Sequence, residues 1–128
     1  MEDLTRDAIF KVNDLKVEKL EIKEWGGSIF IRVLSGEERD KFEEEAYHAK
    51  GGINYKDFRA RFAVQVACDK ERKRLFTDGD VKALSRKSSV PLDKIMSAGM
   101  RLNGMTQQDV EDIVKNSETG QSDASGSN

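Results

Sequence analysis

The chain has 128 residues, of which 36% are charged, yet its formal net charge is only -2 and its sequence pI is about 5.5. This length predicts one domain with a real core, and the slightly acidic balance argues against a general nucleic-acid-binding protein. No apolar run approaches the roughly 18 residues that span a membrane, and the N-terminus lacks the basic start of a signal peptide. The sequence therefore predicts a cytoplasmic protein that binds neither nucleic acid nor membrane.

The sequence of the N-terminal part of the chain predicts β-strands. Residues 8–12 resemble a short strand, and two further strand-like runs flank Gly26 and Gly27. Because glycine accepts positive φ at both central positions of a type I′ turn, these glycines predict a tight β-hairpin. The register that follows pairs Ile22 with Ile31, Leu20 with Val33 and Glu21 with Arg32.

Two aromatic residues of this hairpin lie apart from its aliphatic face. Trp25 is beside the turn, and Phe30 points away from the aliphatic side chains. An isolated hairpin is marginal in water, so we expect the aliphatic face to pack on the helix that contains Phe62. Trp25 and Phe30 then either cover a helix or bind a partner.

Helix-start residues recur through the rest of the chain. Ser35 and Glu38 form a capping box, and similar starts predict helices over 35–49, 54–68, 77–87, 88–102 and 106–115. The helix over 54–68 is apolar over most of its circumference and should be central. The predicted fold class is α+β: an N-terminal β-hairpin packed on a small bundle of four to five helices. One domain should span 1–115, and the Ser-, Gly- and Asn-rich segment 116–128 should be a disordered tail.

Residues for catalysis or metal binding are scarce. His48 is the only histidine and Cys68 the only cysteine, so a metal cluster or a Cys–His pair has too few members. Cys68 lies in an apolar run and should be a buried thiol. The sequence therefore predicts no enzyme, no metal site and no cofactor.

Two further features have alternative interpretations. Residues 70–87 are rich in Lys and Arg and precede a helix-turn-helix-like pair of helices, which would suit a small nucleic-acid-binding regulator; Glu71 and Asp78 dilute that basic segment, which favours a charged connector. Met100 and Met105 are either adaptable core residues or an adaptable contact surface for a partner.

An ordered set of short motifs resembles the tail assembly chaperones of long-tailed bacteriophages or related prophage elements. The resemblance covers roughly Ala8 to Lys115. The motifs are Glu24–Gly27 (EWGG), Arg32–Asp40 (RVLSGEERD), Ala67–Asp69 (ACD), Arg74–Asp78 (RLFTD) and Arg101–Thr106 (RLNGMT).

The resemblance implies a non-enzymatic protein that acts during tail assembly. Such a chaperone binds the tape-measure protein, helps to recruit major tail (tube) protein subunits in the host bacterial cytoplasm, and is absent from the mature virion. A small apolar patch repeated along a long client suits a homo-oligomer. A structural head–tail connector of the same virus class is a further alternative.

Overall fold

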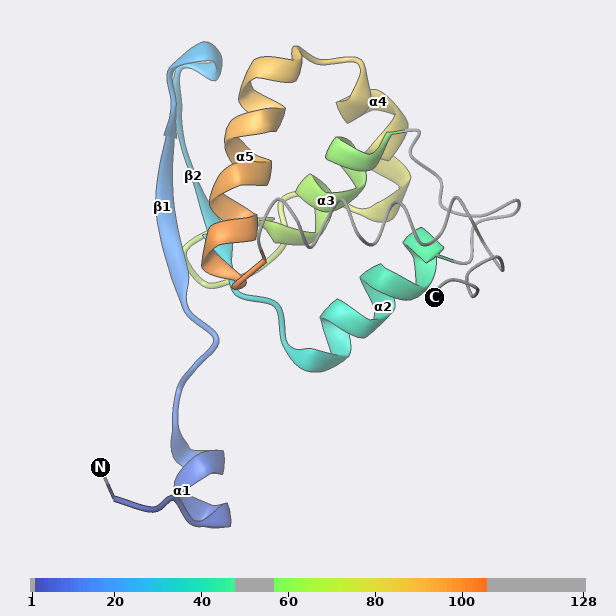
Figure 1. The fold of residues 1–128 in the computed structure, drawn as a ribbon. Coiled ribbons are helices and arrows are strands. Elements are labelled where there is room, and N and C mark those ends of the chain that lie inside the picture. Colours follow the sequence, from blue (N-terminus) through green and yellow to red (C-terminus); the bar gives the residue numbers. More distant parts are fainter. Residues whose placement is uncertain (1, 48–56, 106–128) are drawn as a thin grey trace, which may run out of the picture.

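The fold is described by a computed structural model over residues 2–47 and 57–105 (Figure 1). It confirms the α+β class, with a β-hairpin packed on helices. The elements are α1 (Arg6–Lys11), β1 (Val17–Ile22), the 3-10 turn η1 (Lys23–Trp25), β2 (Gly27–Arg32), α2 (Gly36–Tyr47), α3 (Phe58–Val66), β3 (Ala67–Cys68), the 3-10 turn η2 (Asp78–Asp80), α4 (Val81–Ser85) and α5 (Ser89–Leu102). The predicted helix 106–115, the predicted tail 116–128 and His48 lie outside the described residues.

The hairpin forms, but the predicted register is wrong by four residues. Leu20 pairs with Ile29, and Ile22 pairs with Gly27. The loop is longer than a two-residue turn because Lys23–Trp25 form a 3-10 turn, which Gly26 closes in the left-handed conformation with φ 75°. Gly27 is already part of β2. An even shift keeps every side chain on its predicted face, since side chains alternate with period two.

The first predicted strand, over residues 8–12, is also wrong. The chain there forms α1, because the Thr5 hydroxyl accepts a hydrogen bond from the Ala8 amide at 3.2 Å and caps the helix. None of the residues of α1 is buried. Figure 1 shows α1 at the bottom of the view, away from the body formed by the hairpin and the other helices.

A third strand replaces the end of the predicted helix 54–68. Helix α3 stops at Val66, and Ala67 and Cys68 pair with Ile31 and Phe30 on the free edge of β2. This pairing satisfies backbone groups that the edge of a two-stranded ribbon would leave exposed. The sheet order is β1-β2-β3, and Cys68 is a fully buried free thiol, as predicted.

The starts of α2 and α5 follow the predicted capping chemistry, whereas the side chain of Asp57 at the start of α3 makes no cap hydrogen bond. The Glu38 amide donates to the Ser35 hydroxyl at 3.0 Å, and the Ser35 amide donates to the Glu38 carboxylate at 2.8 Å. The Val90 amide donates to the Ser88 hydroxyl at the start of α5. These are short-range contacts, so the local sequence is sufficient to predict them.

Helix α5 is the element around which the core is arranged. It packs against both strands of the hairpin on one side and against α3 on the other. The aliphatic face of the hairpin was expected to lie on α3, so the order of these elements is corrected: α5 is the principal helix against the hairpin. Phe62 is the largest fully buried side chain, and its ring lies 5.4 Å from that of Phe42.

Gly99 permits the close approach of α5 to α3. A Cβ atom at this position would lie 2.7 Å from Cε2 of Phe62 and 3.2 Å from Cγ2 of Val66. We expect Gly99→Ala to lower the free energy of unfolding by about 1 kcal/mol in urea denaturation, because overpacking costs roughly 1–3 kcal/mol while alanine adds up to about 1 kcal/mol of helix propensity.

Gly36→Ala is the matched control, because a Cβ there meets nothing within 4 Å. It should leave the unfolding free energy unchanged or slightly raised. In a Phe62→Ala background only the contact with Cγ2 of Val66 at 3.2 Å remains, and Gly99→Ala should cost less. Equal effects of Gly99→Ala in both backgrounds would show that the ring contact does not limit the packing.

Candidate functional site

A depression with mostly apolar walls is lined by Trp25 and by residues near α4. One cavity of about 310 Å³ is lined by Trp25, Phe76, Leu84 and Lys87. A second cavity, of about 210 Å³, shares the last three of these and adds Asp80 and Ala83. Because the two cavities share three lining residues, we treat them together and call them the Trp25 groove. It has apolar walls and a charged rim, which suits the side chains of an apolar helix better than a polar ligand.

The four residues predicted to bind a partner have different environments. Trp25 is 37% exposed and lines the groove, whereas Phe30 is half-buried between Lys19 of β1 and Cys68 of β3. Met100 and Met105 are 7% and 5% exposed and belong to the core. The structure therefore places Trp25 at an apolar surface, does not bring the four together, and gives the two methionines the environment of core residues.

A second apolar surface lies on the N-terminal arm (residues 2–16). It was not predicted from the sequence. Ile9 is 51% exposed and Phe10 72%. Leu4 and Val12 are also exposed, and the guanidinium of Arg6 lies 4.9 Å from the centre of the Phe10 ring. The available sequence indication was the Thr5 cap, three residues before Ala8, which predicts a helix rather than a strand.

A charged cluster connects the end of the hairpin to α2 and the 69–74 turn. Arg32 is 5% exposed; its Nε donates to the Gln65 carbonyl at 2.6 Å, and its Nη1 donates to Glu38 at 3.1 Å. Arg72 donates to Glu38 at 2.7 Å and to the Val33 carbonyl at 2.6 Å. The predicted pairing of Arg32 with Glu21 is therefore wrong: Arg32 points inward, and its partner is on α2.

Glu38 has an unusual acidity in this cluster. Burial alone would raise the pKa of its carboxyl group, but the hydrogen bonds from Arg72 and Ser35 and the charge of Arg32 outweigh burial and lower the pKa to about 2. A carboxylate held ionised by two arginines satisfies buried donors, and it is not poised for proton transfer near neutral pH. We interpret the cluster as structural.

The basic segment 70–87 does not present a continuous charged face. Arg72 is engaged with Glu38, and Arg74 donates to the Val64 carbonyl at 2.7 Å and to Asp78 at 2.8 Å. The exposed basic residues on this side are Lys70, Lys73, Lys82, Arg86 and Lys87. Because two arginines of the segment are used to hold the fold, the structure gives no support to a base-reading surface.

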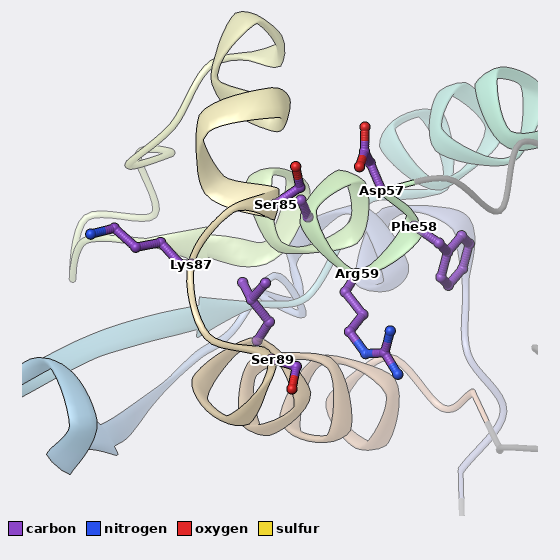
Figure 2. A pocket seen from close by; sticks show the side chains of 8 residues that line it. Asp57, Phe58, Arg59, Ser85, Lys87 and Ser89 are labelled. Carbon is purple, nitrogen blue, oxygen red and sulfur yellow. The ribbon is translucent and has the colours of Figure 1, made fainter.

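A polar cavity of about 180 Å³ lies where α3 begins and α4 leads into α5 (Figure 2). Its labelled side chains spread apart; Lys87 and Phe58 point to opposite sides. A binding site for a small polar ligand needs polar groups that converge, and the labelled side chains of this cavity do not converge.

Among residues 2–47 and 57–105, no group of three or more His, Cys, Asp or Glu side chains is placed to bind a metal ion. No helix in the described part of the chain is long and apolar enough to cross a membrane.

The fold has a known counterpart among solved structures. The tail assembly chaperone of bacteriophage HK97 superimposes with a TM-score of 0.54, covering 76% of this chain and 89% of that chain at 15% sequence identity. The two proteins share a fold. This finding agrees with the motif resemblance, and its coverage extends across most of both chains. Neither a protein-family model nor a curated protein matches the sequence.

Proposed function

We propose that this chain is a non-enzymatic tail assembly chaperone of a long-tailed phage or prophage. The observation that carries the proposal is the shared fold with the HK97 chaperone over most of both chains. The ordered motifs from Glu24 to Thr106, found independently in the sequence, support the same role. In this role the chain acts in the host cytoplasm, binds the tape-measure protein, helps to recruit major tail protein subunits and does not remain in the virion.

The Trp25 groove is the surface that we assign to the client. A tape-measure protein exposes apolar helical surface before the tail tube encloses it, and an amphipathic helix binds by placing apolar side chains in a groove. A cavity of roughly 150 Å³ holds a benzene ring, so the groove at Trp25, with about 310 Å³, accommodates a large aliphatic or aromatic side chain. The charged surface around it keeps the chaperone soluble.

Co-expression with the tape-measure protein tests this proposal. The chain should increase the soluble fraction of the tape-measure protein several-fold, and Trp25→Ala should remove most of that gain, because a central aromatic contributes more than 2 kcal/mol to many interfaces. Leu75→Ala is the control, since Leu75 is 45% exposed but does not line the groove.

Three outcomes contradict parts of the proposal. If the tape-measure protein is equally insoluble with and without the wild-type chain, the chaperone role fails. If Trp25→Ala lowers the thermal unfolding midpoint sharply while its folded fraction still solubilises the client, Trp25 is a core residue and the assigned groove is wrong. If the chain is found in purified mature particles, a head–tail connector replaces the chaperone.

A further inference from the structure

The Trp25 groove has mostly apolar walls, but the charges around it are not balanced. Lys87 lines both of its cavities, and Figure 2 shows its side chain directed away from the polar cavity at the start of α3. Lys23 precedes Trp25 in η1 on one wall, and Arg86 follows Leu84 at the end of α4 on the other. All three cations are exposed, and none pairs with a carboxylate among the described residues.

The carboxylates next to the groove are already engaged. Asp80, which lines one of the two cavities, accepts a hydrogen bond from the Thr77 amide at 2.8 Å as part of the capping box of η2. Glu24 pairs with Lys94 of α5 at 2.9 Å. Three cations without a carboxylate partner therefore surround an apolar depression whose nearest acids are bound to other groups. The rim attracts negative charge in whatever molecule enters the groove.

We infer that the groove selects a client helix that carries acidic residues on both sides of its apolar stripe. This selection rests on the proposed function, because it assumes that the groove receives the client. Apolar side chains at positions i, i+3 and i+4 of the client helix enter the cavities. Carboxylates on one side of the stripe meet Lys87 and Arg86, and those on the other side meet Lys23.

Lys87 is the residue that determines this specificity. It is the cation that lines both cavities, so a carboxylate beside either bound side chain comes close to it. A client helix with basic flanks would bring like charges together at the same rim, and like-charge contacts are a common way for an interface to reject a wrong partner. The apolar walls supply affinity for any apolar stripe, and the rim decides between stripes.

Two synthetic peptides of about 18 residues, long enough to form a helix, test this selection with the purified full chain. Both carry the same stripe of leucines and no tryptophan; the flanking positions are glutamate in one peptide and lysine in the other. Trp25 is the only tryptophan of the chain, so its fluorescence reports directly on the groove. At low salt the acidic peptide should bind roughly tenfold more tightly than the basic one. The difference should shrink at about 1 M salt, where screening limits the reach of a charge to about 3 Å.

Lys87→Glu and Lys70→Glu form a matched pair of variants, because each replaces an exposed lysine and changes the net charge equally. Lys70 lies in the 69–74 turn and lines neither cavity. Lys87→Glu should remove the preference for the acidic peptide, whereas Lys70→Glu should keep it. Circular dichroism checks that both variants are folded. An equal loss of preference in both would show that the net charge of the chain decides, which overturns the proposal.

The peptide experiment and the co-expression experiment can fail separately. Equal affinity of the wild type for both peptides overturns the charge selection even if the chain solubilises the tape-measure protein. A clear preference for the acidic peptide, in a chain that does not solubilise the tape-measure protein, supports the charge selection and removes the proposed function.

Two other occupants of the groove would be recognised in the same experiment. If the Trp25 fluorescence changes with protein concentration and responds to neither peptide, a second copy fills the groove. If peptide binding is seen only after Ile113→Asp, the occupant is the chain's own segment 106–115, whose apolar and acidic residues have the chemistry proposed for the client. Either result overturns the assignment of the groove to a client helix.

Discussion

Phe62→Ala should lower the free energy of unfolding by about 3–5 kcal/mol, the range measured for truncating a fully buried phenylalanine. The side chain is 1% exposed, its ring contacts Phe42 at 5.4 Å between centroids, and it lies directly beneath Gly99 of α5. Removing it opens a cavity between α2, α3 and α5 at once. A small domain is stable by only about 5–15 kcal/mol in total, so urea denaturation should show a large fall in the midpoint.

Phe58→Ala is the matched control on the same helix. Phe58 also contacts Phe42, at 5.9 Å, but it is only half-buried. Its truncation should cost about 1–2 kcal/mol, because part of the ring is already in water. If both variants lose the same free energy, the position of Phe62 at the centre of the core is not what stabilises the fold.

The elements predicted correctly depend on neighbours in the sequence. Ser35, Thr77 and Ser88 each precede a helical turn, and each caps it through contacts within three residues. The apolar stripe of α5, with Leu92, Ile95 and Gly99 buried, has a helical period that reads directly from the sequence. These features depend only on residues that are close together in the sequence, so the sequence alone is sufficient to predict them.

The errors arose where distant parts of the chain decide the outcome. Gly26 and Gly27 fit a two-residue turn, but the hairpin pairs Leu20 with Ile29 because α5 covers that face and a longer loop can close it. Ala67 has helical propensity, yet the open edge of β2 draws it into a strand. Neither the edge nor the covering helix is visible from local pattern.

The candidate site, like the fold, could be predicted only in part from the sequence. Trp25 could be singled out because an aromatic beside a hairpin turn stands out in the sequence. The groove that it lines needs Phe76 and Leu84, fifty or more residues later, and no spacing rule connects them. Met100 and Met105 were ambiguous because their positions fit a core and a surface equally well, and their burial is set by how α5 packs.

Glu38→Gln should cost about 2 kcal/mol at pH 7, because charge-assisted hydrogen bonds contribute roughly 1.5–3 kcal/mol and the carboxylate is partly open to solvent. Glutamine can still accept the Ser35 amide hydrogen bond, so the capping box remains and the substitution tests the charge alone. What is lost is the ion pair with Arg32 at 3.1 Å and that with Arg72 at 2.7 Å.

The pH dependence identifies the origin of this effect. The folded pKa of Glu38, about 2, lies below its ordinary value of 4.5. The unfolded chain therefore binds the proton first, so the contribution of Glu38 is complete above about pH 4.5 and is lost as the pH falls toward 2. The difference in unfolding free energy between wild type and Glu38→Gln should shrink steadily over that window in urea denaturation at pH 7, 4 and 3.

Glu43→Gln is the matched control on the same helix, because Glu43 is as exposed as Glu38 but pairs with a single arginine, Arg39, which is more exposed than Arg32 or Arg72. Its cost should be no more than about 0.5 kcal/mol. If the difference in unfolding free energy between wild type and Glu38→Gln is as large at pH 3 as at pH 7, packing rather than charge makes Glu38 important. A gap that closes while the Glu43 variant stays unchanged would locate the acid sensitivity of this fold at the Arg32–Glu38–Arg72 cluster, where the hairpin, α2 and the 69–74 turn meet.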